Sequence, residues 1–187
     1  MKKIMFNDKY GLTRAVLYGH KTVTRRVINN QKIFDFLAKT FSDYQKLAID
    51  PEWCSYQVDE EVAIAQRYYD IYLDDIGIEP EAKPFKKDHM KSAGWTNKMF
   101  VKAALMPHRI RIKSVRAEHL QDITDDDIRR ECTMFYNFAD KMYEVFGIRG
   151  QFDTLRDGFA ALIDKVGGSG TWKRNPWVLR YEFKLLQ

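Results

Sequence analysis

The clearest pattern of hydrophobic and polar positions lies between residues 152 and 166. Apolar side chains recur there at the three- and four-residue spacing of one helix face: Phe152, Leu155, Phe159, Leu162, Ile163 and Val166. Such a stripe predicts an amphipathic helix that packs against a core. Gly167 and Gly168 follow it and favour the end of that helix.

Three further helices are predicted. Residues 12–18 are a short apolar stretch, and Gly19 suits the C-terminal cap of a helix there. Residues 31–48 carry apolar side chains at helical spacing. A capping box at Thr124 and Asp127 predicts a helix that continues through Ile128 and Glu131.

Several short segments have the composition or alternation of β-strands, namely residues 1–6, 61–67, 100–105, 108–116 and 177–185. In the segment 108–116, Arg109, Arg111 and Lys113 fall on one face, and isoleucines fall on the other. This alternation predicts a half-buried strand with a cationic outer face. Residues 68–92 are tyrosine-rich, then acidic, and contain two prolines, which predicts an insertion or a long loop.

Strands interleaved with a few helices predict the α+β class, with a small β-barrel as one architecture. The sequence does not indicate a parallel Rossmann sheet, because no glycine-rich turn joins a strand to a helix. The 187 residues, 45% of them hydrophobic, are enough for one core, so we expect a single domain. No apolar run approaches the length of about 18 residues that a membrane helix needs. With only Cys54 and Cys132, the chain has no disulfide framework, and we expect a cytoplasmic protein.

Charge is unevenly distributed along the chain. The formal net charge is +5, but residues 1–50 and 91–120 each carry +6, whereas residues 51–90 carry −6. If the fold brings the two basic blocks together, they form a patch for an anionic partner. The alternative is that these blocks are ordinary solvated faces.

The densest polar segment is residues 19–26, Gly-His-Lys-Thr-Val-Thr-Arg-Arg. Its ammonium, guanidinium and hydroxyl groups are suited to phosphate, carbonyl or base-edge acceptors. A lysine of lowered pKa can also activate a nearby threonine hydroxyl. The alternative interpretation is a solvated turn before a strand.

Other candidates are weaker. Lys173 and Arg174 lie between two tryptophans, and Trp95 lies close to Asn97 and Lys98. These segments suit base stacking with phosphate contacts or, alternatively, simple anchoring of loops. The four histidines are scattered without metal-ligand spacing, so we expect no metal and no cofactor. The acidic run 125–127 is better explained as a capped helix N-terminus than as a metal site.

Gly19, Lys21, Thr24 and Arg26 have the spacing G-x-K-x-x-T-x-R, which resembles the signature of the ASCH domain family. Residues 120–131, with Glu131 at their end, are similar to the family's L-x-x-I-T-x-x-D-x-x-x-E segment, and residues 175–183 resemble its last strand in phage-type and bacterial members. The resemblance implies a PUA-like β-barrel flanked by helices, with insertions here around residues 29–56 and 68–98.

The resemblance implies two functions. The first is binding of nucleic acid, RNA above all, in a cationic cleft whose mouth carries Lys21, Thr24, Arg25 and Arg26. The second is an amidohydrolase that acts on acetylated cytidine or a related modified nucleoside. There Lys21 acts as base, Thr24 as nucleophile and Glu131 as proton carrier. A third interpretation is an accessory protein that acts through protein contacts alone.

Overall fold

The computed structural model describes residues 1–29, 33, 35–36, 53–74 and 90–186. This part of the chain combines several helices with strands that pair mainly in antiparallel fashion, so the fold is α+β. The strands are β1 (Lys3–Ile4), β2 (Val23–Val27), β3 (Glu61–Ile64), β4 (Arg109–His119), β5 (Met134–Asn137), β6 (Met142–Val145) and β7 (Trp177–Leu186). The α-helices are α1 (Leu12–Leu17), α3 (Tyr68–Asp74), α4 (Asp125–Glu131), α5 (Leu155–Gly167) and α6 (Thr171–Arg174).

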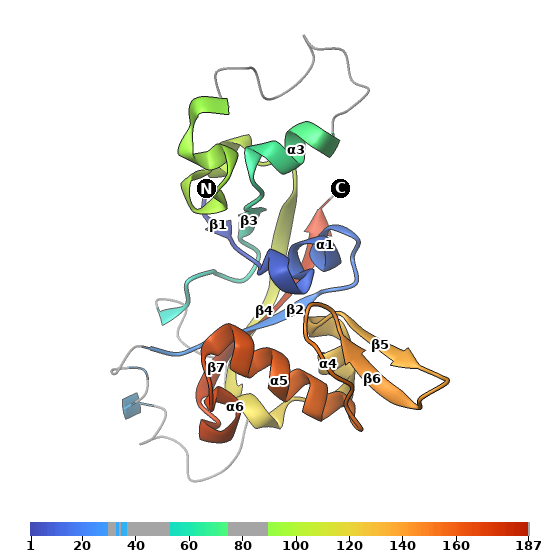
Figure 1. The fold of residues 1–187 in the computed structure, drawn as a ribbon. Helices are drawn as coiled ribbons and strands as arrows, with labels where there is room; N and C mark the ends of the chain where they lie inside the picture. The colour runs from blue at the N-terminus through green and yellow to red at the C-terminus, as the bar shows by residue number, and fades with distance from the viewer. Residues whose placement is uncertain (30–32, 34, 37–52, 75–89, 187) are drawn as a thin grey trace.

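Two sheets organise the described residues. The larger has the strand order β1-β3-β4-β7-β2, and the smaller is the β5–β6 hairpin. Only the β1–β3 pair is parallel. In Figure 1 the long strand β4 runs from α3 and the green 3-10 turns to the group formed by α4, α5 and α6. Neither sheet is a closed barrel among these strands.

Local chemistry explains the helix boundaries. The Thr124 hydroxyl accepts a hydrogen bond from the Asp127 N–H, as the capping box predicts, and α4 begins directly after Thr124, at Asp125. The helix α5 begins at Leu155 rather than at Phe152 because Thr154 caps it. Phe152 instead exchanges two backbone hydrogen bonds with Tyr143 of β6.

The main core lies where α5 packs on the large sheet. Phe159 of α5 is fully buried there, as are Ile110 and Ile112 of β4. A second apolar cluster is formed by Ala63, Ala65, Tyr68, Ile71, Val101 and Met106. Among the described residues, no helix is long and apolar enough to cross a membrane.

Several expected elements need correction. Residues 100–105 are not a strand but parts of two 3-10 turns, η5 (Lys98–Phe100) and η6 (Ala103–Leu105). The side chain of Asn97 caps the first of these turns by accepting a hydrogen bond from the Met99 N–H. The expected loop 68–92 begins with the helix α3, and most of its remainder, like most of the predicted helix 31–48, lies outside the described residues.

The β5–β6 hairpin has no counterpart in the predicted elements. Its strands carry aromatic side chains on both faces, so they lack the apolar and polar alternation that marks a half-buried strand. Its turn places Lys141 at φ 56°, where the sequence has no glycine to indicate a left-handed residue.

Candidate functional site

A cavity of about 480 Å³ lies between β2, residues 5–9 and α5. Four side chains of α5 form its apolar wall, namely Phe159, Leu162, Ile163 and Val166. Lys21, Thr24, Arg26 and Glu131 line the polar wall. The volume lies within the range of about 300–1,000 Å³ that is usual for small-molecule sites. The mixed lining suits a group with apolar faces and polar edges.

Lys21 is held by the turn that follows α1. Gly19 adopts φ 76°, which reverses the chain, and the Lys21 N–H donates to the Ala15 carbonyl at 2.9 Å. The buried Lys21 ammonium donates to the backbone carbonyls of Val23 and Glu131 at 2.7 and 2.5 Å. Burial lowers the pKa of Lys21 to about 8, although the charge of Glu131 opposes that shift.

No carboxylate forms an ion pair with Lys21 among the described residues. Its charge is therefore directed to backbone dipoles rather than cancelled by a salt bridge. The third interpretation, action through protein contacts alone, would be favoured by a Lys21 held in a structural salt bridge, and the described residues contain no such bridge.

Thr24 is buried in β2, opposite Tyr181 of β7, and lines the same cavity. Within the described part of the chain its hydroxyl makes no hydrogen bond. The hydroxyl can therefore donate to or accept from a ligand in the cavity.

Glu131, the last residue of α4, is fixed by one neighbour. Its carboxylate accepts a hydrogen bond from the Arg25 N–H at 2.7 Å and a second from the Arg25 guanidinium. The side chain of Arg25 is only 1% exposed. Its guanidinium also contacts Glu118 and Asp127, both at 2.6 Å.

These contacts correct two expectations. Arg25 does not lie at a cleft mouth, because buried carboxylates occupy its guanidinium. Glu131, the expected proton carrier, lines the cavity, but each of its carboxylate oxygens already accepts a hydrogen bond from Arg25.

The ion-pair cluster extends through the sheet. Asp127 accepts two hydrogen bonds from Arg180 of β7, at 2.8 and 2.9 Å. Arg116 donates to Glu118 at 3.0 Å. Burial raises the pKa of Asp127, but hydrogen bonds from Arg180 and Arg25 outweigh it and hold that pKa well below its usual range. The cluster thereby ties α4 to β2, β4 and β7 behind the cavity.

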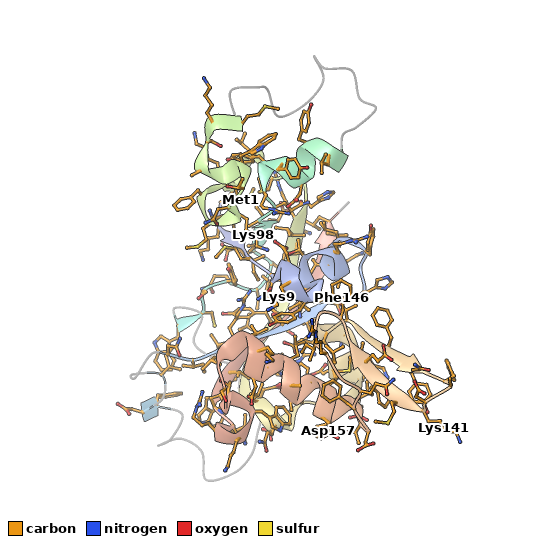
Figure 2. All side chains as sticks on the ribbon, in the orientation of Figure 1. Met1, Lys9, Lys98, Lys141, Phe146 and Asp157 are labelled. Atoms are coloured by element: carbon orange, nitrogen blue, oxygen red, sulfur yellow. The ribbon has the colours of Figure 1, made fainter. Side chains whose placement is uncertain are left out.

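Further cations line the cavity. Arg26 is exposed, and its guanidinium donates to the Met5 carbonyl at 2.5 Å. Lys98, from the second basic block, donates to Asp8 at 2.8 Å, and the exposed Lys9 completes the set. Lys9 and Lys98 lie one above the other near the centre of Figure 2. Parts of both basic blocks therefore meet at this cavity.

Lys9 and Lys98 were not among the predicted site residues. The signals in the sequence were the net charges of their blocks and, for Lys98, its position three residues after Trp95, since neither residue belongs to the G-x-K-x-x-T-x-R spacing. Their place at the cavity depends on long-range packing that the local sequence does not encode.

The other predicted contact residues do not line this cavity. Arg111 and Arg109 face Glu61 at 2.5 and 3.9 Å, and Lys113 is exposed beside a separate hollow. Trp95 packs on Tyr69 and Tyr72. Lys173 and Arg174 are exposed on α6, where the Arg174 guanidinium donates to the Ser169 carbonyl and the Thr171 hydroxyl.

The described residues contain no group of three or more histidine, cysteine or acidic side chains that could hold a metal ion. No family model, curated protein or solved structure matches this chain.

Proposed function

We propose that this protein binds nucleic acid, RNA above all, and that one nucleotide occupies the cavity beside β2. One observation carries the proposal. Lys9, Lys21 and Arg26 all line the cavity, and none of them has a carboxylate partner among the described residues. The two other cations there, Arg25 and Lys98, are paired with Glu131 and Asp8.

Unpaired cations beside an apolar wall match the chemistry of a nucleotide. The α5 side chains can cover the faces of a base, while the Thr24 hydroxyl can reach a polar edge. Arg26 and Lys9 are exposed and can bind phosphate oxygens. The five-stranded sheet does not close among the described strands, but its mainly antiparallel pairing and flanking helices support the further proposal that the fold is related to the PUA-like barrel of the ASCH type.

Salt dependence tests this function. We expect a short single-stranded RNA to bind at low salt and its affinity to fall steadily as salt rises, because phosphate contacts release counterions. An absence of binding at low salt contradicts the proposal.

A second function is favoured by the hydroxyl of Thr24, which has no hydrogen-bond partner among the described residues, and by the lowered pKa of Lys21. In this alternative the cavity hydrolyses the amide of an acetylated cytidine. Neutral Lys21 takes the Thr24 proton as the Thr24 oxygen attacks the acetyl carbonyl. The C–N bond then breaks, and the amine leaves with that proton. Water finally releases acetate from Thr24.

Acetate release from acetylcytidine tests this alternative. We expect turnover by the wild-type protein and none by Thr24→Ala, with Thr22→Ala as the control because Thr22 lies outside the cavity lining. Equal turnover in the wild-type protein and Thr24→Ala contradicts the role of Thr24 as nucleophile, and no turnover in either contradicts hydrolysis; both outcomes leave nucleic-acid binding intact.

A further inference from the structure

Arg26 borders two cavities. One is the cavity beside β2, and the other, of about 640 Å³, also has Arg26 in its lining, together with Trp53, Leu179 and Tyr181. The lining of this second cavity is apolar or aromatic apart from Arg26, Asn29 and Ser55. Arg26 supplies the only charge among the described residues that line it.

The Arg26 guanidinium is positioned by the protein rather than free in solvent. It donates to the Met5 carbonyl at 2.5 Å, and its central carbon lies 5.9 Å from the centre of the Phe6 ring. No carboxylate among the described residues neutralises it. A fixed, uncompensated guanidinium is suited to bind a phosphodiester, because it offers two parallel N–H donors.

Trp53 gives the second cavity an aromatic surface. It is half-buried and packs edge-on against Phe36, with ring centres 4.8 Å apart. A base that stacks on such a ring gains affinity whatever its identity, because every base has a π-face. Asn29 and Ser55 add polar groups for its edge.

We propose that the two cavities bind two adjacent nucleotides of one strand, with the phosphodiester between them on Arg26 and the second base against Trp53. This inference rests on the proposed function, because it requires a nucleotide in the first cavity. Two neighbouring bases can enter separate cavities only when they are unstacked from each other. The site therefore selects single-stranded nucleic acid over duplex.

The test compares a mononucleotide, a dinucleotide and a duplex of the same sequence by calorimetry and by intrinsic tryptophan fluorescence. We expect the dinucleotide to bind roughly ten- to a hundredfold more tightly than the mononucleotide, and the duplex to bind most weakly. Trp53→Ala should remove the advantage of the dinucleotide and leave mononucleotide affinity unchanged.

Trp53→Phe guards against a folding defect, because it keeps an aromatic ring packed against the main core. It should retain most of the dinucleotide advantage and lose the fluorescence change on binding. Trp95→Phe is the matched control, since Trp95 packs on Tyr69 and Tyr72 away from both cavities, and it should retain both properties.

The outcomes separate the two proposals. If the mononucleotide binds and Trp53→Ala keeps the full dinucleotide advantage, the second cavity is overturned and the proposed function stands. If neither nucleotide nor single-stranded RNA binds at low salt, both proposals fail.

Discussion

Arg25 holds Glu131 twice, through its own backbone N–H at 2.7 Å and through its guanidinium. The two residues are 106 positions apart in the chain, and this contact joins β2 to the end of α4. It also fixes the Glu131 carbonyl, which accepts a hydrogen bond from the Lys21 ammonium at 2.5 Å. The geometry of the cavity therefore depends on a buried ion-pair cluster that no ligand needs to touch.

Removal of Arg25 should strongly destabilise the fold. Arg25→Met leaves Glu118, Asp127 and Glu131 buried without their shared cation, and we expect the free energy of unfolding to fall by about 3–5 kcal/mol. Urea unfolding measures this. Arg111→Met is the control, because the partly exposed Arg111–Glu61 pair contributes about 0–1 kcal/mol. Similar losses in the two variants would contradict the role given to the cluster.

Acid should destabilise the protein through Asp127. The pKa of Asp127 is lowered in the folded state, so its unfolded form binds a proton more readily, and stability is lost as pH falls below about 4. We expect urea midpoints to fall between about pH 5 and pH 2. Asp127→Asn should start less stable and show a flatter decline. If the urea midpoint of Asp127→Asn declined as steeply as that of the wild type, Asp127 would not be the cause of the acid sensitivity.

The sequence predicts local structure best where local chemistry decides it. The apolar stripe of α5 and the Thr124 cap of α4 need only neighbouring residues. The burial of Arg25 could not be predicted in this way, because its three carboxylate partners lie 93 to 106 positions away. An arginine beside Arg26 in a polar segment has the same local pattern whether it faces solvent or a buried cluster.

The residues that line the cavity also fall into those that the sequence indicates and those that it does not. The spacing of Lys21 and Thr24 is visible in the sequence, and the structure lines one cavity with both residues. Lys9 and Lys98 join them only through tertiary packing. The bulge between Ile112 and Ser114 shifts the alternation of β4 where the predicted cationic face of Arg109, Arg111 and Lys113 ends.

Ligand binding should depend on pH through Lys21. The pKa of Lys21 is about 8, so the ammonium loses its charge as pH rises through 8. We expect the affinity for single-stranded RNA to fall several-fold from pH 7 to pH 9. Lys21→Met should bind more weakly at pH 7 and show little change over this range. Amide hydrolysis requires the neutral amine, so its rate should rise over the same range.

The turn that follows β6 should influence the cavity through Gly147. A Cβ atom there would lie 2.4 Å from the carbonyl oxygen of Lys9, which lines the cavity, and φ is 77°. We expect Gly147→Ala to lower the melting temperature and to weaken RNA binding by displacing Lys9. Gly150→Ala is the matched control, because its φ is also positive and nothing lies within 4 Å of its Cβ. It should cost only backbone strain and leave affinity unchanged.

The most direct measurement of the central claim is RNA binding by two charge-matched variants. Arg26→Gln removes an exposed cation of the cavity, whereas Lys173→Gln removes an exposed cation of α6 outside it. Fluorescence anisotropy with a labelled single-stranded RNA, at one fixed low salt concentration, gives the two dissociation constants. We predict a loss of roughly tenfold or more for Arg26→Gln and little change for Lys173→Gln. Equal losses would mean that binding follows net charge, and they would contradict a nucleotide site beside β2.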